Sequence, residues 1–356
     1  MQKTTGTSTI FSPLVRKTIN LFSVGRISGA PLTISVPILG ALSLGQSLTS
    51  TDILGLGSIG LCAHLFGFSL NDIIDYPIDC TVPYRKSHPL VTKRISMKEA
   101  WIFAVMQIPI AIGIYIIALD VSRTGAFLML LSIATSAIYN LWSKRGKIPR
   151  YFAELSLALS IGFLCCFGAA TQSTIISLQS VLFSLTLAIL LFLLNSVPSG
   201  LKDIKTDENF NVESFVIASG CRMVGDDGIF IPKKIWWFVF SLQFIVILCF
   251  VILGSHYHPS WFVVILTSAL LLFSTLHLRL ILTISSFEAL QRSSPILNGF
   301  YNYLALCAIV FSWMPSIMKV VYVFLATVVL LLPLRLAYHM LRHRYFLMRP
   351  RYTEND

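Results

Sequence analysis

The sequence predicts an all-α protein, a polytopic membrane helix bundle with nine core transmembrane helices and a tenth near the C-terminus. Hydrophobic residues make up 55% of the 356 residues and charged residues only 12%, and the mean hydropathy is +0.77. A soluble domain carries about 25% charged residues, so the apolar surface of this chain needs lipid as its solvent. Apolar runs of about 20 residues, the length that crosses a bilayer as a helix, also recur along the chain.

The apolar runs set the predicted helices, with boundaries good to about 2–4 residues. The ten predicted spans are 28–48, 52–71, 98–119, 124–142, 152–171, 176–197, 235–254, 260–283, 297–314 and 317–338. We therefore expect a cytoplasmic tail at 1–27, a transmembrane bundle at 28–339 and a basic cytoplasmic tail at 340–356. No linker between globular domains interrupts this pattern.

The basic residues predict the orientation. Cytoplasmic loops of membrane proteins accumulate Lys and Arg, and the ten-helix order puts all but two of the 27 basic residues on one side. Only Arg123 and Lys319 fall on the other. Both termini are thus predicted to be cytoplasmic, in the cytoplasmic membrane or, in a eukaryote, the mitochondrial inner membrane. This bias accounts for the net charge of +11 and requires no nucleic acid partner.

The first acidic cluster follows the second predicted span and reads Asn-Asp-Ile-Ile-Asp-Tyr-Pro-Ile-Asp over 71–79. On a helix, the spacings from Asp72 to Asp75 and from Asp75 to Asp79 place the three acids on one face. Such acids repel each other unless a cation lies among them, and hard carboxylate oxygens suit Mg²⁺. Pro77 lacks an N–H, so we expect the helix to loosen there and Asp79 to lie in a loop.

The second acidic cluster ends the sixth predicted span. Asp203 and Asp207 are again four residues apart, and counting back by four reaches Ser199 and Asn195. The four residues are predicted to form one polar stripe at a helix end. A solvated helix end would explain one such cluster, but two on the same side of the membrane favour a metal site.

Basic residues accompany both clusters. Arg85, Lys86 and His88 follow the first, Lys144 and Arg145 end the fourth span, and Lys202 precedes Asp203. Acids and bases together at one membrane face suit a diphosphate bridged by metal, because both kinds of cation neutralise charge on a leaving group. The orientation bias alone explains most basic residues, so only those nearest the acids are candidates.

The chain resembles the UbiA superfamily of intramembrane prenyltransferases. The run NDIIDYPID resembles the family's NDxxDxxxD motif, RKSHPLVTKRIS is similar to its R-T-x-x-R-P-L-x-x-G-x-I-S stretch, and LKDIKTD resembles its DxxxD motif. YNLWSKR resembles the family's Tyr followed by Lys-Arg. The resemblance covers roughly residues 20–314, and four helices separate the two acidic motifs.

The resemblance implies a site and a reaction. Two Mg²⁺ ions would be held on an isoprenoid diphosphate by Asn71, Asp72, Asp75, Asp79, Asp203 and Asp207, of which Asp72, Asp75, Asp203 and Asp207 would be catalytic. The implied substrate-binding residues are Asn71, Arg85, Lys86, His88, Tyr139, Lys144, Arg145, Asn195, Ser199 and Lys202. Ionisation would give an allylic carbocation, which a small-molecule acceptor would attack, for example an aromatic quinone precursor.

Some positions depart from the family pattern. His88 stands where the family usually has Arg, Lys93 where it has Gly, and Ser199 where some members have an acid. The tenth helix would be an addition to the usual nine. Outside the motifs, His64 is expected to be either a buried structural residue or part of a cavity wall, and Asp226-Asp227, between glycines, to form a turn.

Two other functions fit the same residues. A terpene cyclase of the same fold would use the same metal site, with the substrate's own double bond attacking the cation, and the sequence does not separate it from a transferase. An ion-coupled transporter would need acids near the bilayer midplane, whereas these acids lie at helix ends.

Overall fold

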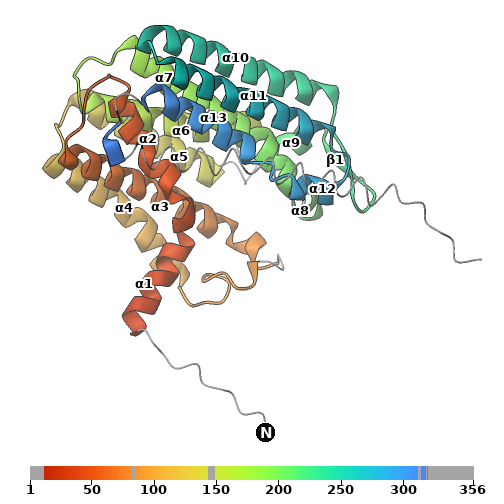
Figure 1. The fold of residues 1–356 in the computed structure, drawn as a ribbon. Coiled ribbons are helices and arrows are strands. Elements are labelled where there is room, and N and C mark those ends of the chain that lie inside the picture. Colours follow the sequence, from red (N-terminus) through yellow and green to blue (C-terminus); the bar gives the residue numbers. More distant parts are fainter. Residues whose placement is uncertain (1–11, 82–84, 143–148, 312–313, 318, 320–356) are drawn as a thin grey trace, which may run out of the picture. The chain divides into compact units, whose positions relative to one another are not determined.

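The computed structural model describes residues 12–81, 85–142, 149–311, 314–317 and 319. Most of these residues are helical, and the chain divides into two compact units, residues 1–184 and 185–356. Figure 1 shows the elements in chain order, coloured along the sequence.

Seven helices in the described part of the chain are long and apolar enough to cross a membrane, and a bent pair could make an eighth. The seven spans are Ser50–Asp79, Met97–Ala118, Arg123–Trp142, Arg150–Ala170, Leu178–Asn209, Lys233–Tyr257 and Trp261–Thr283. They correspond to the second through eighth predicted spans and confirm the prediction of a polytopic membrane bundle.

The first predicted span, 28–48, corresponds to the second half of the bent pair, and the first half lies in the predicted tail 1–27. Helix α1 (Pro13–Val24) leads through the 3₁₀ turn η1 (Ile27–Gly29) into α2 (Ala30–Leu42), with a bend of 58° between the two halves. The ninth predicted span corresponds to α13 (Leu297–Ile309), which is 13 residues long. The tenth, 317–338, lies almost entirely outside the described residues.

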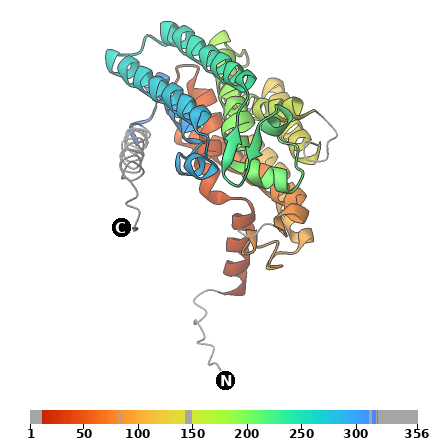
Figure 2. The ribbon, with the colours of Figure 1, turned by 90° about the vertical axis from the view of Figure 1, so that its right-hand side faces the viewer.

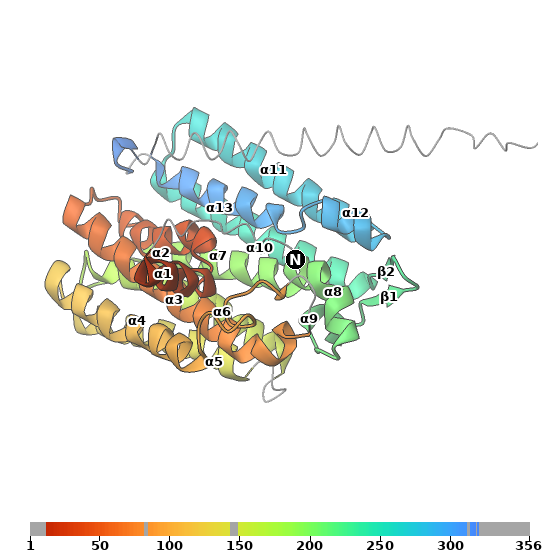
Figure 3. The same ribbon diagram turned by 90° about the horizontal axis from the view of Figure 1, so that it is seen from below.

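The first unit is built from α1, η1, α2, α3 (Ser50–Asp79), α4 (Met97–Ala118), α5 (Arg123–Trp142) and α6 (Arg150–Ala170). Helix α3 packs against α2, α4 and α5, which Figure 3 shows from below. Capping boxes begin α3 at Thr49 and α4 at Ser96. In each, the side chain of the cap residue accepts a hydrogen bond from the backbone N–H of an acid three positions later, and the side chain of that acid accepts one from the backbone N–H of the cap residue. Two backbone N–H groups at the start of the helix are thereby paired.

Helices α2 and α6 approach closely at two glycines. A Cβ atom at Gly40 would lie 1.8 Å from the carbonyl oxygen of Cys165, and one at Gly168 would lie 1.8 Å from that of Pro37. Small residues allow membrane helices to pack backbone against backbone. This contact holds α2 against the rest of the first unit.

The boundary between the units falls inside α7 (Leu178–Leu194). The chain then continues through a π-helical turn, η3 (Asn195–Ser199), into α8 (Gly200–Asn209), followed by α9 (Phe215–Ala218). Strands β1 (Arg222–Val224) and β2 (Gly228–Phe230) form an antiparallel hairpin, drawn as arrows in Figure 2. Its turn contains Asp226 and Asp227, as predicted.

Three further helices complete the second unit: α10 (Lys233–Tyr257), α11 (Trp261–Thr283) and α13, with the short α12 (Phe287–Arg292) between the last two. Helices α11 and α13 lie side by side. Gln243 of α10 and Asn302 of α13 pair their buried amides, at 3.0 and 3.3 Å. Beneath α8, a hydrophobic cluster includes Leu201, Ile204, Val216, Ile229 and Leu290.

Candidate active site

The first acidic cluster lies on the last turns of α3. Asp72 is 0% exposed, Asp75 8% and Asp79 7%. The expectation that Asp79 lies in a loop is wrong, because α3 continues through Pro77 to Asp79. A proline so near the helix end removes only one late backbone hydrogen bond, and the following turn is kept by the Cys80 N–H, which donates to Tyr76 O at 3.1 Å.

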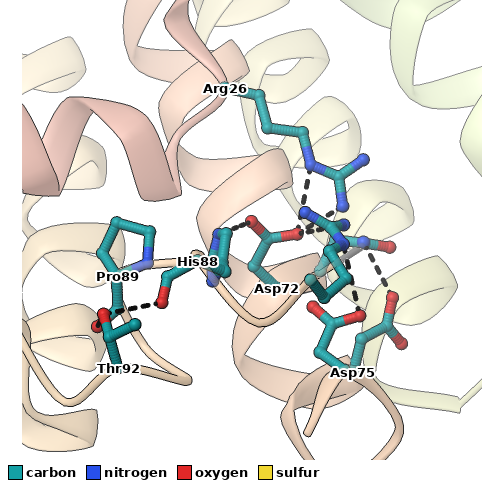
Figure 4. A network of polar contacts seen from close by, with 9 residues as sticks. Arg26, Asp72, Asp75, His88, Pro89 and Thr92 are labelled. Carbon is teal, nitrogen blue, oxygen red and sulfur yellow. Dashed lines mark hydrogen bonds and ion pairs between the residues drawn. The ribbon is translucent and has the colours of Figure 1, made fainter. Parts of the chain in front are cut away.

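A buried carboxylate is costly unless it is paired, and Asp72 is paired with three basic side chains. Arg26 donates through Nε at 3.1 Å and through Nη2 to Asp72 Oδ1. Arg85 Nη2 lies 3.5 Å from the same oxygen, and His88 Nε2 lies 2.9 Å from Oδ2. Figure 4 shows Arg26 and His88 reaching Asp72 from opposite sides.

Arg85 also connects the acids with one another. Its Nε lies 3.4 Å from Asp79 Oδ1 while its Nη2 faces Asp72. Asp75 accepts a hydrogen bond from Asn71 Nδ2 at 3.0 Å. Asn71, Arg85 and His88, which the sequence selected as site residues, therefore contact the acids of the first cluster.

Arg26 was not selected from the sequence. It lies at the break between α1 and η1, where its backbone is left-handed with φ of +47°, and its side chain also covers the Phe68 ring. In sequence it is one of several basic residues of the N-terminal tail, 46 positions before Asp72. No local pattern connects the two residues, since the contact depends on how α2 packs against α3.

His64 supports the backbone at this break. It is 1% exposed, and its Nε2 lies 3.1 Å from Arg26 O. A carbonyl can only accept, so Nε2 carries the proton and Nδ1 accepts from the Thr33 hydroxyl at 3.0 Å. His64 is thus a buried structural residue, the first of its two predicted alternatives.

The donor set of the first cluster fits Mg²⁺ in chemistry. It offers carboxylate oxygens, and Asp79 Oδ2 is buried without a hydrogen-bond partner among the described residues. Among the described residues, no group of three or more Asp, Glu, His or Cys side chains is arranged so that it could hold a metal ion by itself. Mg²⁺ commonly takes only one or two carboxylates and completes its shell with substrate phosphates and water, so it does not need such a set.

The second cluster lies on α8, in the second unit. Asp203 and Asp207 are half-buried, four residues apart within one helix. Lys202 Nζ lies 3.3 Å from Asp203 Oδ2. Asn195 and Ser199 belong to the π-helical turn η3, whose wider turn breaks the predicted i,i+4 alignment with Asp203.

The other predicted site residues are placed as follows. Lys86 is exposed and forms no ion pair with an acid of the described residues. Tyr139 is half-buried on α5. Lys144 and Arg145 lie outside the described residues.

Comparisons with known proteins identify relatives of the chain. A family model described as the UbiA prenyltransferase family matches residues 34–292. No curated protein sequence matches significantly.

Among solved structures, one reported for digeranylgeranylglyceryl phosphate synthase in membranes has a TM-score of 0.62 at 15% identity, covering 83% of this chain and 98% of the other. A UbiA homologue of Archaeoglobus fulgidus bound to GPP and Mg²⁺ has a TM-score of 0.55 at 15% identity, covering 81% and 99%. An apo UbiA homologue of Aeropyrum pernix K1 has a TM-score of 0.56 at 18% identity, covering 78% and 94%. At these identities the similarity establishes the fold alone.

Proposed function

The chain belongs to the UbiA prenyltransferase family, and we propose that it is a magnesium-dependent enzyme that transfers an isoprenoid chain from its diphosphate to a small-molecule acceptor. One observation carries this proposal. Asp72, fully buried near the end of a membrane span, is surrounded by Arg26, Arg85 and His88. Carboxylates and cations in a site screened from water are what recognition of a metal-bound diphosphate requires.

The acids are assigned to the metal. Asp72, Asp75 and Asp79, with Asn71, offer oxygen ligands on consecutive turns of α3. Asp203 and Asp207 offer a second pair on α8, and their part in the same reaction rests on the two sequence motifs. Bound Mg²⁺ would neutralise the charge that develops on the departing diphosphate.

The cations are assigned to the diphosphate. Arg26 and Arg85 each contact Asp72 through the guanidinium, whose planar set of donors can bind phosphate oxygens in pairs. If a metal ion engaged Asp72, both guanidinium groups would be available to donate to the phosphate oxygens instead. The same substrate is assigned further binding residues on the resemblance to the family motifs alone: Lys86, Tyr139, Lys144, Arg145, Asn195, Ser199 and Lys202.

The reaction follows from these assignments. The allylic C–O bond breaks, its electron pair leaves with the diphosphate, and the acceptor's electron pair forms the new bond to carbon. The GPP and DMAPP complexes of the Archaeoglobus homologue support a diphosphate donor of this class. An aromatic quinone precursor is the proposed acceptor, because such a ring is electron-rich enough to attack an allylic cation and then lose a proton.

The site is proposed to face the cytoplasm, with both termini on that side, because the loops following the acids carry the excess of basic residues. Reporters fused at the N-terminus and in the hairpin near Arg222 should both read cytoplasmic. If either reporter lies on the other side of the membrane, this orientation is wrong.

The function can be tested with purified protein in lipid, prenyl diphosphates of several lengths and a panel of acceptors, with products identified by mass. We expect a prenylated acceptor only when Mg²⁺ is present. Full turnover in excess chelator would overturn the metal assignment. A cyclised hydrocarbon formed without acceptor would identify a terpene cyclase instead.

A further inference from the structure

The β1–β2 hairpin is tied to α12 through Asp227. The Asp227 carboxylate accepts from the Ser286 hydroxyl at 2.5 Å and from the Glu288 N–H at 2.8 Å. The backbone joins the same contact, since Phe287 N donates to Asp227 O at 2.6 Å and Ile229 N to Ser285 O at 2.8 Å. One side chain therefore both holds the hairpin turn and caps the short helix α12.

The hairpin is tied in turn to α8. Lys205 Nζ donates to the carbonyl oxygen of Asp226 at 2.8 Å, and the Met223 N–H donates to Glu208 Oε1 at 2.8 Å. Lys205 also lies over the Phe287 ring, 5.8 Å from its centroid. These contacts place two side chains of α8 against the hairpin and α12.

Helix α12 closes the loop of contacts. Gln291 Nε2 donates to the carbonyl oxygen of Lys202, in the first turn of α8. The hairpin, α12 and α8 thus hold one another in a closed ring of hydrogen bonds. Leu201, Ile204, Ile229 and Leu290 lie beneath them in one hydrophobic cluster.

Lys205 holds α8 on the side opposite to its two acids. A helix turns about 100° per residue, so Lys205 lies about 200° around the axis from both Asp203 and Asp207. Asp203 keeps a side chain that is 47% exposed. The Lys205 contacts therefore lie on the side of α8 opposite to Asp203 and Asp207.

We propose that the hairpin (221–230) and residues 285–292 form a clamp that sets the rotation of α8, so that Asp203 and Asp207 are presented together to metal-bound diphosphate. Asp227, Lys205 and Glu208 are then positioning residues, which contact neither substrate nor metal. The effect of the clamp on the reaction rests on the proposed function, whereas the clamp itself is defined by contacts within the second unit.

The central test compares Asp227→Ala with Asp226→Ala. The two variants lose the same charge from adjacent turn positions, but only Asp227 holds Ser286 and Glu288 through its side chain. Asp227→Ala removes the acceptor of two charge-assisted hydrogen bonds, so we expect it to raise amide hydrogen exchange in α8 and α12 by roughly tenfold or more. Mn²⁺ binding, measured by electron paramagnetic resonance without substrate, should weaken at the same time, and Asp226→Ala should match the wild type in both.

A second pair of variants separates positioning from metal binding at Glu208. Glu208→Gln keeps an oxygen that can accept from Met223 N–H, whereas Glu208→Ala does not. We expect Gln to preserve the Mg²⁺ concentration for half-maximal activity and Ala to raise it roughly tenfold. If both variants raise this Mg²⁺ concentration equally, Glu208 is a metal ligand and its assignment to the clamp is overturned.

The outcomes distinguish the clamp from the function it serves. If the wild type shows no Mg²⁺-dependent transfer, the proposed function fails, and exchange in α8 still tests the clamp. If the wild type is active but Asp227→Ala and Asp226→Ala exchange alike in α8, the clamp is overturned. If exchange rises while Mn²⁺ binding and the half-saturating Mg²⁺ concentration stay unchanged, the positioning role is overturned.

Discussion

Arg26 donates two hydrogen bonds, from Nε and Nη2, to a single carboxylate oxygen of Asp72. The contact joins the break between α1 and η1 to the last turns of α3. Because Asp72 is fully buried, removal of Arg26 would leave a buried charge with fewer partners, and such a loss is costly.

We therefore expect Arg26→Ala to reduce kcat/KM about tenfold to a hundredfold, since a hydrogen bond to a charged group contributes about 1.5–3 kcal/mol. Arg26→Lys should recover only part of this, because Lys cannot reproduce two donors in a plane. Steady-state kinetics normalised to folded protein would measure the effect. Arg94→Ala, which removes an exposed arginine, is the control, and equal rates for the two Ala variants would remove Arg26 from the site.

Arg85 should respond differently from Lys86, although the two are adjacent. Arg85 lies within 3.5 Å of both Asp72 and Asp79, whereas Lys86 is exposed. Arg85→Ala is expected to lower kcat about tenfold or more and Lys86→Ala to change it little. If both substitutions lower kcat equally, the loop acts through its total charge and not through Arg85.

The spans and both acidic motifs could be predicted from the sequence because their signals are local. Apolar runs define helices, and acids at i,i+3 and i,i+4 share a face wherever the helix continues. The Asp226-Asp227 turn was equally local, since glycines flank it.

Features that depend on packing could not be predicted. The helix α1 lies in what was expected to be a tail, and Arg26 meets Asp72 only after α2 packs on α3. The π-helical turn that shifts Asn195 and Ser199 out of line with Asp203 has no pattern in the sequence that distinguishes it from an α-helix. Pro77 lacks a backbone N–H, as the sequence indicates, but the helix continues through it to Asp79.

The contacts of Asp227 should be insensitive to pH in the physiological range. The hydrogen bond from Ser286, followed by that from Glu288 N–H, lowers the pKa of this carboxyl below its ordinary value. A lowered pKa means that the stabilisation is present above the unfolded value, about 3.9, and is lost as pH falls through the folded value. The rate of amide hydrogen exchange in α12, corrected for the intrinsic rate at each pH, should stay constant from pH 8 to 5 and rise only below about pH 4. Asp227→Asn should lack this acid step, and a step near pH 6 would contradict the assignment.

Lys93 occupies a backbone conformation that favours glycine. Its φ is +59°, and it stands where the family motif has Gly. A left-handed conformation costs about 1–2 kcal/mol in a residue with a Cβ, and glycine loses about 0.5–1 kcal/mol more backbone entropy on folding. Lys93→Gly should therefore raise the stability by about 0.5–1 kcal/mol, measured as a higher unfolding temperature. Arg94→Gly, at an adjacent exposed position without positive φ, should give no gain, and a gain there of equal size would refute the backbone explanation.

The close contact between α2 and α6 makes the sharpest prediction about stability. A methyl group at Gly168 would lie 1.8 Å from Pro37 O, a backbone atom that cannot turn aside as a side chain can. Gly168→Ala must therefore push the two helices apart, and overpacking of this kind costs about 1–3 kcal/mol or more. Gly113→Ala in α4 is the matched control, because no atom lies within 4 Å of its added methyl group. In an open helical position Ala is favoured over Gly by about 1 kcal/mol, so Gly113→Ala should leave the unfolding temperature unchanged or raise it. If the unfolding temperature falls by a similar amount in both variants, the backbone contact of α2 with α6 is not the cause of the loss.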